Sequence, residues 1–162
     1  MRRVLLAMVI AAAGLLFTVS QPHAQGTDTW IGNWVLNVDQ SSWSPAELAP
    51  KSQTTKITAS AGGNTAVTDG VDAAGKKTHT EITYKFDGME YELKGAPEAK
   101  TTRAYTRVDD HAYTTAMKVN GTITTTSRVA VTADGKTRTE VTTGRDADGR
   151  IIRNFLVFNK QP

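Results

Sequence analysis

The chain has 162 residues, of which 39% are hydrophobic and 22% are charged, a composition typical of a folded domain and not of a disordered segment. Cysteine is absent, which excludes disulfides, thiolate metal sites and a cysteine nucleophile. The formal net charge is +3, but Arg2 and Arg3 supply part of it and leave 17 basic and 16 acidic residues in the rest of the chain. This near-neutral remainder lacks the excess of basic residues that is typical of nucleic-acid-binding proteins.

Residues 1–24 have the pattern of a secretory signal peptide. Arg2 and Arg3 precede an apolar run from residue 4 to residue 19, and the small residue Ala24 stands at the expected cleavage point. The run is shorter than the about 20 residues of a membrane-spanning helix, which makes an uncleaved anchor the weaker alternative. We expect residues 25–162 to form a single domain that is periplasmic or secreted.

Short alternating segments rich in threonine follow, and Gly, Asp and Asn turn signals separate them. Among these signals, Asp87-Gly88 predicts a tight hairpin. Threonine, with 24 residues after position 24, is β-branched and favours strands. The predicted strands are 30–37, 52–59, 65–71, 76–86, 89–93, 101–108, 111–119, 122–132, 137–143 and 151–159. The segment 41–50 contains Trp43 and two prolines and predicts a loop or one short helical turn.

The turns between these segments are too short for parallel crossovers, so consecutive strands are expected to be antiparallel neighbours. Closure into a barrel removes the two free edges of such a sheet, whereas a sandwich usually needs some longer connections. The sequence therefore predicts an all-β, antiparallel up-and-down barrel of about 8–10 strands. The last segment, 151–159, is apolar on both faces, and we expect it to pair with the first.

Alternation of side chains along a strand assigns each central segment an apolar face and a face of threonine and charged residues. The apolar faces are expected to line the interior. Their members are Ile82, Tyr84, Phe86, Tyr113, Met117, Val119, Ile123, Val129 and Val131. An outer-membrane barrel would need an apolar outer band and two aromatic girdles, which 11 aromatic residues do not supply.

The first strand opens with Gly32-Asn33-Trp34, which resembles the Gly-x-Trp signature of lipocalins, or calycins. The resemblance implies a lipocalin-like barrel with room for a small ligand. It also implies that Trp34 packs across the closed end beneath an arginine from near the last strand, for which Arg153 is the first candidate and Arg150 the second. The Thr-Asp-Tyr segment of the middle lipocalin motif is missing.

The chain after the signal is similar over most of its length to a group of small secreted bacterial proteins without assigned function. The similarity lies in the Gly32–Asn37 opening, the Ser42-Trp43-Ser44-Pro45 segment and Asp134-Gly135-Lys136 turn between threonine-rich strands. It implies an architecture and a compartment, and no activity.

The side chains that could act in catalysis or bind a metal do not form a recognisable catalytic or metal-binding pattern. His79 and Glu81 share a strand face, but no third metal ligand accompanies them. No Gly-x-Ser-x-Gly nucleophile elbow is present, and Asp146 to Gly149 lacks the downstream glutamate of a calcium loop. We expect no enzyme activity, no metal and no cofactor.

The aromatic residues are the stronger indication of function. Candidate ligand-binding residues are Trp43, Tyr84, Phe86, Tyr113 and Met117, and Gly32, Trp34 and Arg153 are expected to be structural. Trp43 is either a lid over a ligand or a plug that seals the barrel. The leading hypothesis is an exported barrel that binds a small, partly apolar molecule without catalysis, and that contacts neither nucleic acid nor, after cleavage, a membrane. The alternative is a structural or inhibitor-like interaction barrel with a filled core and functional loops, whose protein partner the sequence does not identify.

Overall fold

The computed structural model describes residues 28–146 and 148–162, so the predicted signal peptide lies outside the described residues. All ten predicted strands are present, with two short 3-10 turns in the segment 38–48. The elements are β1 (Gly32–Leu36), η1 (Val38–Gln40), η2 (Ala46–Leu48), β2 (Ser52–Ser60), β3 (Gly63–Val71), β4 (Lys77–Tyr84), β5 (Asp87–Glu92), β6 (Thr101–Arg107), β7 (Ala112–Val119), β8 (Thr122–Val131), β9 (Thr137–Arg145) and β10 (Ile151–Gln161).

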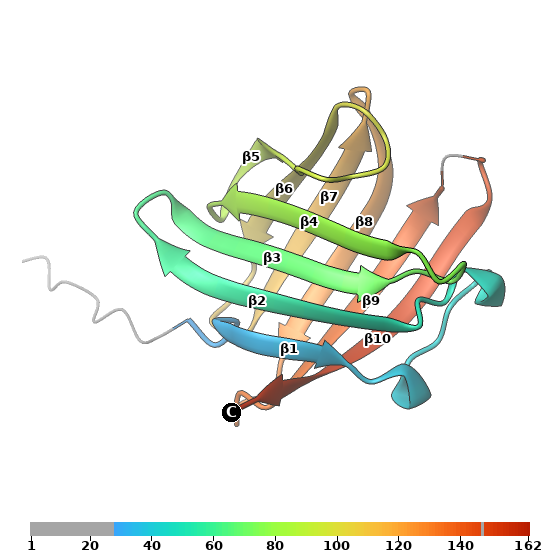
Figure 1. The fold of residues 1–162 in the computed structure, drawn as a ribbon. Coiled ribbons are helices and arrows are strands. Elements are labelled where there is room, and N and C mark those ends of the chain that lie inside the picture. Colours follow the sequence, from blue (N-terminus) through green and yellow to red (C-terminus); the bar gives the residue numbers. More distant parts are fainter. Residues whose placement is uncertain (1–27, 147) are drawn as a thin grey trace, which may run out of the picture.

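The ten strands form one antiparallel sheet that curls into an up-and-down barrel (Figure 1). Their order in the sheet is β4-β3-β2-β1-β10-β9-β8-β7-β6-β5, so every neighbouring pair except β1 and β10 is consecutive in the chain. This arrangement confirms the predicted fold class and is consistent with a calycin-like fold. A sandwich is excluded because a single continuous sheet surrounds the core.

The pairing of β1 with β10 joins the two ends of the chain, as the sequence predicted. Trp34 lies opposite Lys160, and Leu36 lies opposite Phe158. Beyond β1 the chain makes the η1 turn and returns to β10, where Ser42 and Phe155 form a further antiparallel bridge. The outer edge of β10 is therefore covered along most of its length by residues that precede β2.

The barrel remains unpaired between β4 and β5, where the sequence predicted a tight hairpin at Asp87-Gly88. The isolated bridge here pairs Glu81 of β4 with Lys94, which follows β5, and Asp87 already belongs to β5. The connection is made by residues 85 and 86 instead. Phe86 turns into the interior, and its ring centroid lies 4.8 Å from that of Trp30. The turn therefore forms two residues earlier than predicted, and the partly buried Phe86 ring packs against the core.

A β-bulge in β8 reverses the predicted orientation of Ile123. The register with β7 shifts between Met117 and Lys118, which leaves Thr124 as the extra residue. An extra residue moves the following alternation to the opposite face. Ile123 is therefore 57% exposed beside Lys118, whereas Val129 beyond the bulge is buried as predicted.

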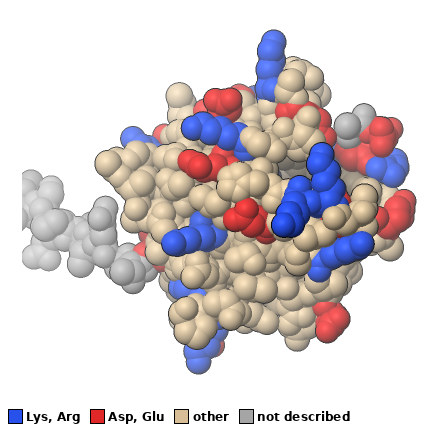
Figure 2. Space-filling model, in the orientation of Figure 1, with Lys and Arg blue, Asp and Glu red and all other residues tan. Residues whose placement is uncertain are grey.

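The outer surface carries interspersed positive and negative side chains and no large region of one sign on the face shown in Figure 2. Ion pairs link some of these side chains across strands, such as Lys118 Nζ of β7 to Glu90 Oε1 of β5 at 2.6 Å. In the described part of the chain, no helix has the length and apolar character needed to cross a membrane.

Candidate functional site

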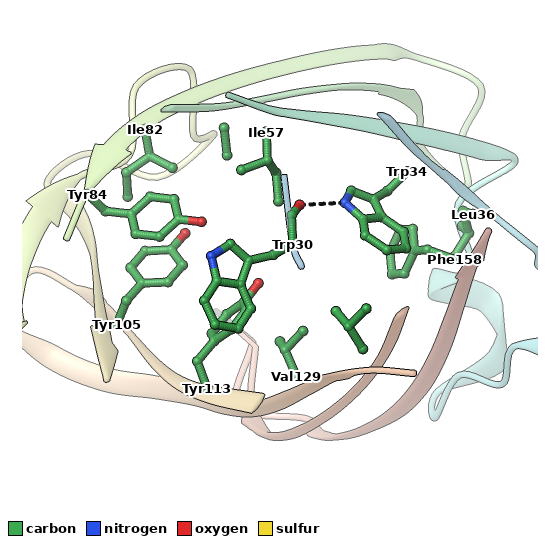
Figure 3. Close-up of a cluster of buried hydrophobic side chains, with 12 residues drawn as sticks. Trp30, Trp34, Leu36, Ile57, Ile82, Tyr84, Tyr105, Tyr113, Val129 and Phe158 are labelled. Carbon is green, nitrogen blue, oxygen red and sulfur yellow. Dashed lines mark hydrogen bonds between the residues drawn. The ribbon is translucent and has the colours of Figure 1, made fainter. Parts of the chain in front are cut away.

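One end of the barrel interior is filled by aromatic rings (Figure 3). Trp30, Trp34 and Phe158 are each 0% exposed, and the Trp34 indole donates a 2.7 Å hydrogen bond to the Trp30 carbonyl. Arg107 covers Trp30 from outside, with its guanidinium 4.7 Å from the ring centroid, and pairs with Asp28 at 2.8 Å. The segment before β1 thus closes this end of the barrel.

The arginine that packs on Trp34 is Arg138 of β9, not Arg153. The Arg138 guanidinium lies 4.1 Å from the Phe158 centroid and 5.7 Å from the Trp34 centroid, whereas Arg153 is exposed on the outer face of β10. The prediction therefore placed the arginine one strand too late. Arg138 of β9 lies directly opposite Phe158 of β10 and faces inward with it.

The backbone conformation at Gly32 favours glycine and gives this residue a structural role. Its φ of +142° is rarely adopted by residues with a side chain, and a Cβ atom there would collide with the Lys160 side chain. Lys160 Nζ in turn lies 5.2 Å from the Trp34 ring centroid. Gly32 therefore allows Lys160 to lie close to Trp34.

Three tyrosines form the boundary between the aromatic end and the rest of the interior. The rings of Tyr84 and Tyr105 stack with centroids 3.7 Å apart, and Tyr113 meets Trp30 edge-on at 5.5 Å. Figure 3 shows the Tyr84 and Tyr105 hydroxyl groups directed toward the interior. Burial raises the pKa of all three phenols, and the charge of Arg103 opposes this rise at Tyr105. The three side chains are therefore neutral hydroxyl groups at physiological pH.

Beyond the tyrosines the interior contains a cavity of about 270 Å³. Its walls combine apolar side chains, such as Ile57 and Val129, with threonine hydroxyls on β2, β3 and β4. Thr55 and Thr68 satisfy one another through a 3.0 Å hydrogen bond across β2 and β3. The volume lies just below the range of about 300–1,000 Å³ that is usual for small-molecule sites.

Two arginines and one glutamate also line this cavity: Arg103, Arg138 and Glu140. Arg138 is only 4% exposed, and no hydrogen bond or ion pair joins it to another described residue. Arg103 donates a 3.7 Å hydrogen bond to the Met117 sulfur, and Glu140 accepts one from Thr142 at 3.3 Å. The described residues thus leave both guanidinium groups without a carboxylate partner.

The predicted ligand-binding residues separate into two groups. Tyr84 and Tyr113 line the cavity, as does Tyr105 between them. Phe86 packs among the rings of the aromatic end, and Met117 contacts Arg103 without lining the cavity. Trp43 is half-buried against the margin of the core and does not reach the cavity wall.

Sequence reasoning missed the charged residues of the cavity for identifiable reasons. Arg103 could have been found, because alternation along β6 places it on the same face as Tyr105. Arg138 and Glu140 could not be found in this way, since Val141 is the apolar residue of their strand. Val141 points outward and is 47% exposed, so hydrophobicity alone assigns the wrong face of β9 to the interior.

A second hollow, of about 400 Å³, lies on the outer surface of β6 to β9. It is lined mainly by small side chains, including Ala104, Ala116 and Thr126, and it contains no inward-pointing cluster of charged groups. Its shape reflects the small residues of this outer face, and nothing in its walls selects a ligand.

The histidine considered above as a metal ligand forms a surface hydrogen bond with an aspartate. His79 Nδ1 lies 2.7 Å from Asp69 Oδ1, and both side chains are more than half exposed. Within residues 28–146 and 148–162, no group of three or more His, Asp or Glu side chains is arranged to hold a metal ion.

A scan against protein-family models and a search of curated proteins found no match for this chain.

Proposed function

We propose that this protein is an exported barrel that binds a small, partly apolar molecule in its interior and releases it unchanged. The observation that supports this proposal is the cavity of about 270 Å³ beside a fully packed aromatic end. Protein interiors are normally close-packed, and a void of this size forgoes stabilising contacts. Larger side chains on the strands could fill such a void. We therefore expect a barrel that keeps it to use it as a binding site.

The mixed lining fits a ligand with an apolar part and a polar part. Ile57, Ile82 and the tyrosine rings provide apolar surface, whereas threonine hydroxyls and the two arginines provide hydrogen-bond donors. In small-molecule sites a few placed polar groups fix the orientation of the ligand, and this cavity has a larger polar share in its lining than most such sites. The proposed periplasmic or secreted location rests on the signal-like residues 1–24, and the proposal includes no catalytic step.

Native mass spectrometry of protein purified from its own periplasm tests the proposal. We expect a small mass that is retained under native conditions and lost on denaturation. In parallel, a neutral environment-sensitive fluorescent probe should bind the emptied protein in a saturable manner. Absence of both the retained mass and saturable probe binding would favour the filled, interaction-type barrel instead.

A pair of matched variants assigns any binding to the interior. Ala66 is buried on the cavity wall, and Ala66→Phe places a ring in the cavity without removing any polar group. Ala104 lies on the wall of the outer hollow, so Ala104→Phe adds the same bulk outside the barrel. We expect Ala66→Phe to abolish binding and Ala104→Phe to preserve it, with folding of both checked by circular dichroism. The reverse pattern would place the ligand on the outer surface.

A further inference from the structure

The buried polar atoms that lack a partner are all of one kind. Among the described residues they are Trp30 Nε1, Arg103 Nε and Arg138 Nε, and each is a nitrogen that donates a hydrogen bond. Buried polar groups are nearly always paired in folded proteins, and each exception calls for an explanation. The interior of this barrel therefore has a surplus of donors and a shortage of acceptors.

The formal charges lining the cavity have the same imbalance. Arg103 and Arg138 contribute two positive charges, and Glu140 is the single carboxylate on the cavity wall. None of the ion pairs within 4.0 Å that the described residues form includes any of these three side chains. A buried charge without a partner is costly, so a net charge of about +1 here favours a bound group of charge −1.

Packing holds the Arg138 guanidinium in place without neutralising it. The guanidinium carbon of Arg138 lies 4.1 Å from the Phe158 ring centroid and 5.7 Å from that of Trp34, and an aromatic face can hold a guanidinium while leaving its edge free. Because its terminal nitrogens make no hydrogen bond to a described residue, they remain available to a molecule in the cavity. A guanidinium edge matches the two oxygens of a carboxylate.

We propose that the ligand is a small organic monoanion whose carboxylate is bound by Arg138 and Arg103. This inference rests on the proposed function and adds the chemical class of the ligand. The apolar body of the molecule lies against Ile57, Ile82 and the stacked rings of Tyr84 and Tyr105, which line the same cavity. At about 30 Å³ for each water-sized group, the cavity holds a ligand of roughly ten non-hydrogen atoms.

Benzoate and benzamide test the inference directly, because they have the same size and shape and differ in charge. We would titrate each into ¹⁵N-labelled protein at constant ionic strength and follow the amide resonances. Charge-assisted hydrogen bonds to an oxyanion predict that benzoate binds at least about tenfold more tightly than benzamide. Sodium phosphate, titrated in the same way, reports binding of an inorganic oxyanion.

Three arginine variants identify the groups responsible. We expect Arg138→Gln and Arg103→Gln each to weaken benzoate binding about tenfold or more and to change benzamide binding less than about threefold. Arg128→Gln is the matched control, because Arg128 is exposed on the outer face of β8, and its benzoate affinity should equal that of the wild type. If an interior variant does not fold, the wild-type comparison of the two ligands still decides the inference.

Each remaining outcome has a distinct meaning. Equal binding of benzoate and benzamide would overturn the monoanion inference and leave the proposed function standing. Tighter binding of phosphate than of benzoate would overturn the organic ligand class. Failure of both aromatic ligands to bind, together with no retained mass in native mass spectrometry, would overturn the inference and the proposed function together.

Discussion

The two ends of the barrel interior differ in how completely they are filled. At one end Trp30, Trp34 and Phe158 are fully buried against one another, and Arg107 with Asp28 closes the exit. At the other end threonines, Arg103 and Glu140 surround a cavity of about 270 Å³. The same ten strands therefore hold a close-packed core and an under-filled one, which separates the residues that stabilise the fold from those free to bind.

This division has a physical basis in the kind of side chain at each end. Aromatic rings bury large apolar areas and gain from edge-on and offset contacts, so a small cluster of them contributes strongly to stability. Threonine hydroxyls pair across strands, as Thr55 and Thr68 do, and tolerate water or a polar ligand beside them. A cavity lined by such groups costs less than an equal void among the rings.

Trp34→Ala is expected to have the largest effect, because it removes a fully buried ring of the packed end. Loss of a fully buried tryptophan costs about 3–5 kcal/mol, against a typical domain stability of roughly 5–15 kcal/mol. Urea unfolding followed by circular dichroism measures the change. Trp43→Ala is the control, because Trp43 is only half-buried at the core margin, and it should cost much less. Equal losses for the two variants would contradict the distinction between the packed end and its surroundings.

Tyr113→Ala is expected to be less destabilising than Trp34→Ala, since Tyr113 lies between the two regions. Its ring contacts Trp30 and Phe86 on one side and faces the cavity on the other. An existing void makes additional void less costly, so we expect a loss of about 2–3 kcal/mol together with altered probe affinity. Tyr113→Phe keeps the ring and should change stability little. A loss as large as that of Trp34→Ala, without any probe binding to perturb, would show that this side of the ring is close-packed.

Gly144→Ala tests the backbone of the cavity end. Gly144 has φ of +151°, and a Cβ atom there would collide with the carbonyl of Thr124 at the β8 bulge. Strain of this kind costs about 1–3 kcal/mol, measurable as a lower urea midpoint. Gly135→Ala is the control, since its φ is +69° but nothing lies within 4 Å of the added atom. A smaller loss at Gly144 than at Gly135 would mean that the bulge adjusts freely.

The buried tyrosines predict a loss of stability at high pH. Burial raises the pKa of Tyr84, Tyr105 and Tyr113 in the folded protein, so above about pH 10 the unfolded chain releases these protons first. Stability is therefore fully present below pH 10 and falls as the pH rises further. Tyrosinate absorbance should appear for these three residues only as the barrel unfolds. Ionisation of all four tyrosines without unfolding would show that the phenols are accessible.

Strand number, strand direction and the pairing of the first strand with the last could be predicted from the sequence because they follow from the alternation and turn patterns. Alternating threonine-rich segments and Gly or Asp turns define the ten strands, and the doubly apolar last segment indicates its pairing with the first. The unpaired gap between β4 and β5 could not be predicted, because Asp87-Gly88 is a favourable hairpin sequence. The structure places the turn at residues 85 and 86, where the Phe86 ring packs against the core.

The candidate site was predicted less completely, because its charged members contradict the usual hydrophobic pattern. The tyrosines of the cavity wall follow from alternation, but Arg138 and Glu140 occupy the face of β9 that hydrophobicity assigns to solvent. Their inward direction is fixed by the register of β9 against β8 and β10, which depends on contacts distant in the sequence. The bulge at Thr124 escaped prediction for the same reason.

The most direct test of the account is the location of bound benzoate in the amide titration of the wild-type protein. Thr55, Thr68 and Thr80 line the cavity from β2, β3 and β4 and are remote from the outer hollow. The account predicts saturable shifts of their amide resonances, with little change at Thr126 and Thr143, which line the outer hollow. Shifts that do not saturate, or that are confined to the strands beneath the outer hollow, would contradict an interior binding cavity.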